Sequence, residues 1–297
     1  MAVLQTYQVT TNREDLTDII TNITPTKTPF LSSIRSTKAY NTLHEVMTDT
    51  ATVPTANDNA RVEGLDFQDE AQHAPTRVGT YTQIIAKYPK VSGTQQAVKT
   101  AGGIKNLYNY NVTLKLKEAA LAIEYADING TGNSGASGTA REIKGFLACI
   151  ATNTATSTAA SGDALTETML NDLLEDIWDN GGDPDAVYCT GSLKRKISGF
   201  TGGATKNVDA KAKKLIASVD VYEGDFGLQK IIAHRLMPAK TIAALEQDKW
   251  AQAWLRKTKH EPLAKTGDSV RGQIVGETAL EARNEKANGK YLNVLGL

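Results

Sequence analysis

Apolar side chains recur at helical spacing in the stretch "IKNLYNYNVTLKLKEAALAIEYADIN", residues 104–129. The residues that form the pattern are Ile104, Leu107, Leu114, Leu116, Leu121, Ile123, Tyr125 and Ile128. Such a helix would be about 39 Å long, from the rise per residue of an α-helix, and Gly130 follows as a C-terminal cap. Heptad-spaced leucines also occur in coiled coils, but only about three repeats are present and Glu118 interrupts them. The pattern therefore favours one helix that spans a domain.

A second helix is predicted over "TETMLNDLLEDIWDN", residues 166–180. Thr166 fits an N-cap, and Gly181 follows as a stop. The carboxylates of this stretch fall on the solvent side of the predicted helix, which argues against a catalytic pair there. Its apolar stripe consists of Met169, Leu170, Leu173, Leu174, Ile177 and Trp178.

Most other apolar stretches are short and rich in β-branched and aromatic residues, as in strands. Only "SLKRKI" (192–197) favours a short helix. Strands and helices do not alternate regularly, so the sequence predicts an α+β fold rather than a doubly wound parallel sheet. The predicted strands are "LHEVMT" (43–48), "TYTQIIAKYPKV" (80–91), "DAVYCT" (185–190), "VDVYEG" (219–224), "LQKIIAHRL" (228–236), "WAQAWLRKT" (250–258), "GQIVGETALEARNE" (272–285) and "GKYLNVL" (289–295).

Between the first two strands lies the polar stretch "DTATVPTANDNARVEGLDFQDEAQHAPTR", residues 49–77, whose main large apolar residues are Leu65 and Phe67. A structureless loop of this length is uncommon inside a compact domain. We therefore expect a long two-stranded flap that reaches out of the domain. Such a segment buries too little apolar area to order itself alone.

The chain opens with an arm, residues 1–39, that contains "LTDIITNITPTKTPFLSSI". Two apolar groups, residues 19–23 and 30–34, are separated by Pro25 and Pro29, which disfavour a continuous helix. This arrangement predicts an arm whose apolar groups find their partner surface outside its own domain.

Composition excludes several classes of protein. The 33 Lys and Arg balance the 33 Asp and Glu, so the chain has no overall field that attracts nucleic acid. It contains neither a basic n-region with an apolar run, as in signal peptides, nor an apolar stretch long enough to cross a membrane. Cys149 and Cys189 lie in apolar stretches and are expected to be buried thiols in a reducing compartment.

The sequence predicts no catalytic, cofactor or metal site. "GTGNSG", residues 130–135, matches a dinucleotide motif but follows a predicted helix instead of opening one, so we interpret it as a turn. His44, His73, His234 and His260 have no metal-ligand spacing among them. No nucleophile elbow or phosphate-binding loop is present.

A basic run occupies residues 194–214, opposed only by Asp209. It is either a surface that faces nucleic acid or an acidic neighbour, or a solvated helix and loop. No aromatic residues alternate with the charges to stack on bases. The basic residues of the run are Lys194, Arg195, Lys196, Lys206, Lys211, Lys213 and Lys214.

Several stretches taken together resemble the major head proteins of tailed bacteriophages. They are the arm "DLTDIITNITPTKTPFLSSI", the flap "TVPTANDNARVEGLDFQDEAQHAPTRVGTYTQIIAK", then "ADINGTGNSG", "IKGFLACI" and "KTGDSVRGQIVGETALEARNEKANGKY". The resemblance implies the Hong Kong 97 shell fold. Its parts would be an N-terminal arm (1–39), an extended loop (40–99), a peripheral domain with a spine helix (100–137), an axial domain (138–237) and a return to peripheral strands (238–297).

The resemblance also implies a structural protein, and no enzyme, that self-assembles in pentamers and hexamers. The product would be the icosahedral capsid of a virion, built in the host bacterial cytoplasm around double-stranded DNA held by non-specific contacts. Portal, scaffolding and decoration proteins would be partners. Because the chain starts at Met1 without a long helical extension, a separate scaffolding protein is expected. The extended loop would contact the adjacent subunit through Arg61, Glu63, Leu65, Phe67, Asp69 and Glu70.

Three other hypotheses stay open from sequence. A compartment shell of the encapsulin kind shares the expected architecture. A soluble hydrolase would need a catalytic serine or a carboxylate pair. A nucleic-acid-binding module would use the basic run, and its affinity would fall steeply with salt.

Overall fold

The computed structural model describes residues 27–51, 63–64, 72–98, 104, 106–200 and 220–296. These residues fall into two compact units. Unit 1 contains Ala86–Leu121 and Thr258–Val275, and unit 2 contains Thr28–Ile85, Ala122–Lys257 and Gly276–Leu297. The fold is α+β, as the sequence predicted. Among the described residues, no helix combines the length and apolar character needed to cross a membrane.

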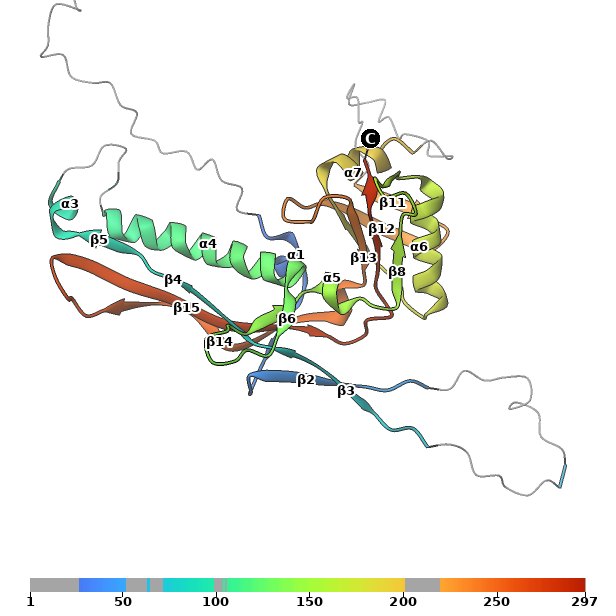
Figure 1. The fold of residues 1–297 in the computed structure, drawn as a ribbon, viewed down its shortest axis with the longest axis horizontal. Helices are drawn as coiled ribbons and strands as arrows, with labels where there is room; N and C mark the ends of the chain where they lie inside the picture. The colour runs from blue at the N-terminus through green and yellow to red at the C-terminus, as the bar shows by residue number, and fades with distance from the viewer. Residues whose placement is uncertain are drawn as a thin grey trace, which may run out of the picture. The chain divides into compact units, whose positions relative to one another are not determined.

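The predicted long helix is α4, Leu107–Asn129 (Figure 1). It begins later than expected because the Asn106 side chain accepts a hydrogen bond from Asn109 N across 3.1 Å, as an N-cap does. Gly130 ends it where a Cβ would lie 2.2 Å from Ile143 O, too close for any other residue.

The apolar stripe predicted for this helix is wrong at two positions, since Tyr125 and Leu116 are 56% and 38% exposed. The buried side of the C-terminal half keeps Ile123 and Ile128 of the predicted stripe and adds small and acidic residues. The added residues are Ala119, Glu124, Ala126 and Asp127. A hydrophobic pattern cannot identify this side, because it gives no weight to alanine and counts buried carboxylates as solvent-facing.

One sheet has the order β1, β14, β15, β4, and β5 also pairs with β15. The first strand, β1 (Arg35–Lys38), runs parallel to the start of β14 (Trp250–Leu263). In unit 1, β5 (Lys90–Ser92) runs antiparallel to the start of β15 (Ser269–Ala282). β4 is Gln83–Lys87, and α3 (Gly93–Ala97) follows β5 with Ser92 as its N-cap.

The second sheet lies in unit 2 and has six strands in the order β11, β12, β10, β13, β16, β8. Their bounds are β11 Val221–Gly224, β12 Gly227–Ala233, β10 Ala186–Cys189, β13 Thr241–Leu245, β16 Gly289–Leu292 and β8 Asn153–Thr156. The boundary expected between residues 237 and 238 therefore does not separate two sheets. β13 and β16 follow this boundary in the chain, but they belong to the same sheet as the strands before it. β13 pairs antiparallel with β10, and β16 pairs antiparallel with β13.

Strand β10 shows why this sheet is buried on both faces. Val187 and Cys189 pack into one core cluster, with α6 (Glu167–Asp179) and α7 (Gly191–Ile197). Ala186 and Tyr188 point to the other face and pack with α1 (Pro29–Ser33) and α5 (Phe146–Cys149). This alternation is the period of a strand, and Figure 1 shows α6 lying along the sheet.

Helix α6 confirms its predicted caps and one face of its predicted stripe. Thr166 Oγ1 accepts a hydrogen bond from Met169 N across 3.2 Å, and Gly181 follows with a φ of 80°. Leu170, Leu173, Leu174 and Ile177 are buried against the sheet. Trp178, predicted to be buried, is 60% exposed. Consecutive helical residues point about 100° apart, so burying Ile177 turns Trp178 away from the sheet.

Three smaller pairings complete the described strands. β6 (Thr131–Asn133) and β7 (Glu142–Lys144) form a hairpin, and the glycine-rich motif, predicted to be a turn, supplies β6 itself and the first residues of the turn after it. β9 (Asp163–Ala164) runs parallel to β17 (Val294–Leu295). β2 (Leu43–Thr48) and β3 (Thr76–Tyr81) pair only with each other among the described strands.

Candidate functional site

The β2–β3 hairpin is the base of the predicted flap. Its strands are antiparallel over the full register from Leu43↔Tyr81 to Thr48↔Thr76. Met47 is 65% exposed and Val78 is 45% exposed, so the ribbon presents apolar side chains to solvent. A two-stranded hairpin alone is marginally stable in water, and exposed apolar side chains on it are typical of a surface that another chain covers.

Most of the proposed contact residues of the flap lie outside the described residues. These are Arg61, Leu65, Phe67, Asp69 and Glu70. Glu63 is described and lies exposed in a turn, next to Gly64 at a φ of 81°. The contact role of all six residues stays a prediction.

The base of the hairpin is held by Glu281 of β15, a residue that the sequence did not single out. His44 Nε2 lies 3.0 Å from Glu281 Oε2, and Thr37 Oγ1 of β1 donates to the same oxygen across 2.8 Å. Arg283 Nε donates to Glu281 Oε1 across 2.7 Å. These hydrogen bonds, with that of His44 the largest, lower the pKa of Glu281 to about 2. One ionised carboxylate therefore ties β1, β2 and β15 together.

A second buried carboxylate, Glu277, anchors the hairpin of β6 and β7. Arg141 Nη2 lies 2.6 Å from its Oε1, and Arg256 Nε lies 3.0 Å from its Oε2. Thr82 Oγ1 also donates to Glu277 Oε1, across 2.9 Å. Arg141 donates in addition to the carbonyl of Thr82, 3.2 Å away. Buried charges persist when paired and hydrogen-bonded in this way.

The end of the arm is built into the core of unit 2. Phe30 is fully buried and lies 4.9 Å from Phe146, 5.8 Å from Tyr188 and 6.2 Å from Trp250, measured between ring centroids. The expectation that the second apolar group of the arm needs a surface outside its domain is therefore wrong for Phe30. The first apolar group, residues 19–23, lies outside the described residues.

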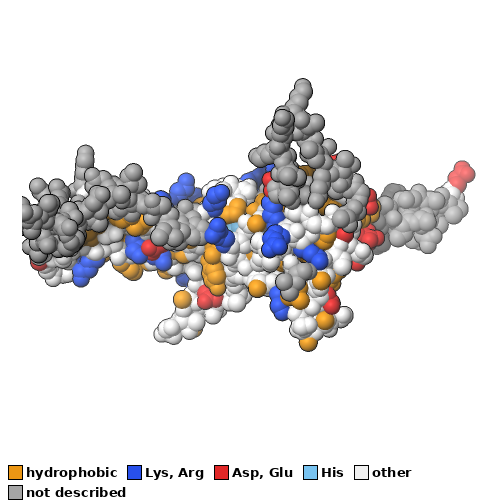
Figure 2. Space-filling model, turned by 90° about the horizontal axis from the view of Figure 1, so that it is seen from above, with side chains coloured by type: hydrophobic (Ala, Val, Ile, Leu, Met, Phe, Trp, Pro, Cys, Tyr) orange, Lys and Arg blue, Asp and Glu red, His pale blue; other side chains and the backbone are white. Residues whose placement is uncertain are grey.

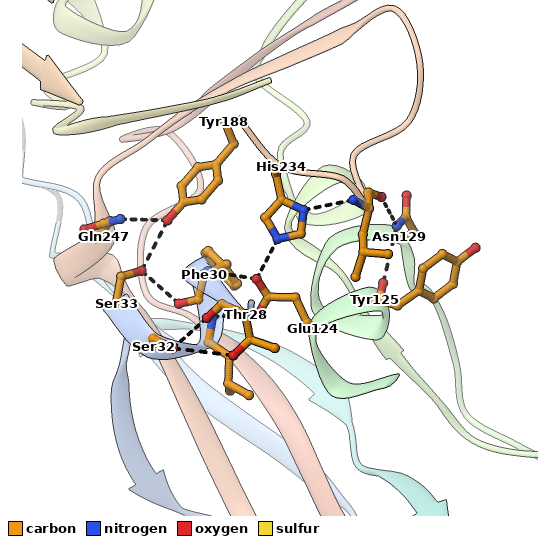
Figure 3. Close-up of polar contacts among 12 residues, drawn as sticks. Thr28, Phe30, Ser32, Ser33, Glu124, Tyr125, Asn129, Tyr188, His234 and Gln247 are labelled. Atoms are coloured by element: carbon orange, nitrogen blue, oxygen red, sulfur yellow. Dashed lines mark hydrogen bonds and ion pairs between the residues drawn. The ribbon is translucent and has the colours of Figure 1, made fainter. Parts of the chain in front are cut away.

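Glu124 of α4 fixes the short helix α1 in this position (Figure 3). Its Oε1 accepts from Phe30 N across 2.8 Å, and its Oε2 accepts from Leu31 N across 2.7 Å. These are the otherwise unpaired amides of a helix N-terminus, where negative charge is favoured. His234 Nε2 lies 2.7 Å from Glu124 Oε1, and both side chains are almost fully buried. The carboxylate thus joins the arm, the long helix and the segment after β12.

Two further polar groups surround this junction. Tyr188 Oη accepts from Gln247 Nε2 across 2.7 Å and lies 3.2 Å from Ser33 Oγ, and burial raises the pKa of Tyr188 to about 12. Asp127, one turn after Glu124, is completely buried, and desolvation raises its pKa well above the usual range. Burial thus disfavours the charged form of Asp127, whereas Glu124 accepts hydrogen bonds from two backbone amides and lies 2.7 Å from His234 Nε2.

The described histidines do not meet. His44 contacts Glu281, His234 contacts Glu124, and His260 Nε2 lies 2.9 Å from Tyr108 Oη within unit 1. His73 lies 4.0 Å from Asp49. Within the described ranges, no three His, Cys, Asp or Glu side chains gather to hold a metal ion. Cys149 and Cys189 are free thiols, and burial raises their pKa values to about 11 and 12.

The basic run is only partly described. Lys194 of α7 is half-buried, donates to Asp220 Oδ1 across 2.6 Å, and donates to the carbonyl of Ile231. Arg195 is exposed and Lys196 is half-buried. On the face drawn in Figure 2, Lys and Arg side chains form several separate groups. Lys206, Lys211, Lys213 and Lys214 lie outside the described residues.

Comparison with known proteins identifies the family of this chain. A model of the SU10 major capsid protein family matches residues 3–295. The chain belongs to the SU10 major capsid protein family. It is a structural protein of a phage capsid shell and not an enzyme. No curated protein matches it.

Solved structures of low sequence identity show the same fold. The capsid of Cyanophage A-1(L) has a TM-score of 0.73 at 12% identity, with 98% of each chain covered. The capsid of a native GTA particle has a TM-score of 0.69 at 14% identity, with 97% of each chain covered. An encapsulin of Synechococcus elongatus PCC 7942 has a TM-score of 0.63 at 10% identity, covering 100% of this chain and 97% of the other. The fold is therefore the Hong Kong 97 shell fold.

Proposed function

We propose that the capsid protein assembles into a closed icosahedral shell of pentamers and hexamers in the host bacterial cytoplasm, and that the β2–β3 hairpin reaches the adjacent subunit. The single observation that supports this is a hairpin that pairs with no other described strand and exposes Met47 and Val78. Apolar surface of this kind is stabilised when another copy covers it. Leu65 and Phe67 would be the anchors, and Arg61, Glu63, Asp69 and Glu70 would set the register.

The shell would enclose double-stranded DNA and bind it without sequence specificity. A chain with zero net charge has no overall attraction for DNA, so contacts would be local and sensitive to salt. A separate scaffolding protein, a portal and decoration proteins would complete the particle. The parts of the subunit would be the arm, the extended loop, a peripheral domain around α4 and an axial domain around the six-stranded sheet.

Electron microscopy of the purified protein tests the proposal. The matched variant replaces residues 50–76 with a short Gly-Ser linker. The full chain should form closed shells, and the variant should remain a folded subunit that forms none. Normal shells from the variant would contradict the role of the hairpin. Subunits of the full chain that never associate, with or without co-expressed phage assembly proteins, would contradict the proposed function itself.

A further inference from the structure

Trp178 of α6 and Phe226, which is partly buried against the core, form an aromatic surface whose exposed part is Trp178. Trp178 is 60% exposed, and its ring lies 6.2 Å from that of Phe226 in the turn between β11 and β12. An exposed groove of about 500 Å³ lies at this point, lined by Trp178, Gly181, Gly182, Asp183, Asp225 and Phe226. We call it the Trp178–Phe226 groove.

The rim of the groove is acidic. Between Glu167 and Asp185 the chain contains no Lys or Arg. Lys230 lies on β12, between the buried residues Gln229 and Ile231, so it points to the opposite face of the sheet. Asp183 and Asp225 line the groove, and Glu175 and Asp179 are exposed on α6 within three residues of Trp178. An aromatic surface with an acidic rim fits a basic segment, whose Lys or Arg stems pack on the rings while the charges reach the carboxylates.

The same chain carries such a segment. Residues 194–214 contain seven Lys and Arg and one Asp, within a chain of zero net charge. The segment begins on α7, which packs in the same core cluster as α6, so every copy carries both the groove and the start of the basic run. Arg195 is exposed at its described end.

We propose that the Trp178–Phe226 groove binds the basic run, residues 194–214, of a second copy of this chain. This inference rests on the proposed function, because the contact would be one of the interfaces between subunits of the proposed shell. The contact joins two different surfaces, so it is heterologous, and a heterologous contact whose rotation closes builds the rings of the proposed pentamers and hexamers. The aromatic rings supply buried area, and the opposite charges select the register and suppress wrong pairings.

Charge reversal on each side tests the contact. The acid-reversed variant is Glu175→Lys/Asp179→Lys, which changes two exposed positions one helical turn apart on α6. The base-reversed variant is Lys211→Glu/Lys213→Glu/Lys214→Glu. Each variant alone should raise the protein concentration at which shells appear by at least about tenfold, because like charges then face each other. An equimolar mixture should form six-membered rings, in which the two variants alternate and each reversed surface meets an opposite one, whereas a five-membered ring keeps at least one mismatched contact.

Controls separate this contact from loss of folding. Both variants should keep a melting temperature within about 2 °C of that of the unaltered subunit, because the changes on α6 are at the surface. Trp178→Ala should also impair assembly without changing the melting temperature. The matched control is Glu142→Lys/Asp248→Lys, which reverses two exposed carboxylates away from the groove and should assemble normally.

Three outcomes would overturn the inference while leaving the proposed function intact, provided that the unaltered protein forms shells. The reversed variants assemble as the unaltered protein does. In the second outcome, the equimolar mixture does not assemble and only a chain with both reversals does. This result would place the contact between two parts of the same copy. Alternatively, the acid-reversed variant is unaffected, and the only defect of the base-reversed variant is that its shells lack DNA. This result would assign the basic run to binding nucleic acid.

Discussion

His234 and Glu124 form a buried pair in which the imidazole donates and the carboxylate accepts. The direction follows from the other ring nitrogen. Leu236 N donates to His234 Nδ1 across 3.1 Å, so Nδ1 carries no proton and a neutral ring carries its proton on Nε2, 2.7 Å from Glu124 Oε1. Asn129 Nδ2 holds the same segment through the carbonyl of Leu236, 3.0 Å away (Figure 3). The pair fixes the arm and the segment after β12 to one point of α4.

Replacing Glu124 with Ala should lower the free energy of unfolding of the subunit by about 3 kcal/mol, because His234 and two amides of α1 lose their acceptor in the core. Urea unfolding measures the change. Glu118→Ala is the control on the same helix, since its pair with Lys115 is a surface ion pair and should contribute less than about 1 kcal/mol. Equal effects of the two substitutions would contradict the anchoring role of Glu124.

Replacing Phe30 with Ala should lower the free energy of unfolding by about 3–5 kcal/mol, the usual cost of a cavity left by a buried ring. The reason is that Phe30 packs against three aromatic rings of its own subunit. Tyr40→Ala removes a ring that is 82% exposed and should change stability little. If Phe30→Ala affected only assembly and left the isolated subunit as stable as before, the ring would belong to an interface.

The sequence predicted elements better than it predicted which sides of them are buried. The N-cap and the buried positions of α6 follow from residues that are close in the sequence. The N-cap role of Thr166 and the burial of Ile177 could therefore be predicted from their sequence neighbours alone. Trp178 follows the buried Ile177 on α6, and the sequence pattern alone does not show which of the two packs against the sheet. Glu124 and His234 are separated by 110 residues and look like ordinary surface residues in the sequence. Only the fold shows that both enter a core.

Acid should loosen the attachment of the β2–β3 hairpin. Folding lowers the pKa of Glu281 from 4.5 to about 2, so its ionised form stabilises the folded state fully above about pH 4.5. This contribution should disappear as the pH falls from about 4.5 to about 2, because protonation removes the acceptor of His44 and Arg283. Hydrogen exchange of the β2 and β3 amides, followed against pH, measures it.

The Glu281→Gln variant should already show fast exchange of the hairpin amides at neutral pH, with little further change down to about pH 2. Glu142→Gln, at an exposed carboxylate on β7, serves as the control and should keep the profile of the unaltered protein. A Glu281→Gln profile that still bends between pH 4.5 and 2 would assign the transition to another group.

Replacing both Met47 and Val78 with Ser should leave the isolated subunit as stable as before and should slow or prevent shell formation. The side chains are 65% and 45% exposed in the subunit, so they contribute little to its core, but covering them in a shell would add roughly 1.5–3 kcal/mol for each fully buried side chain. A shell repeats the contact at every copy, so a small loss per contact becomes a large loss for the particle. Light scattering during assembly and thermal unfolding of the subunit measure the two effects. Ile84→Ser, at a position that is 52% exposed on β4, is the matched control and should assemble normally. Assembly of the double variant at the rate of the unaltered protein would show that these two side chains, which lie on opposite faces of the hairpin, stay in solvent.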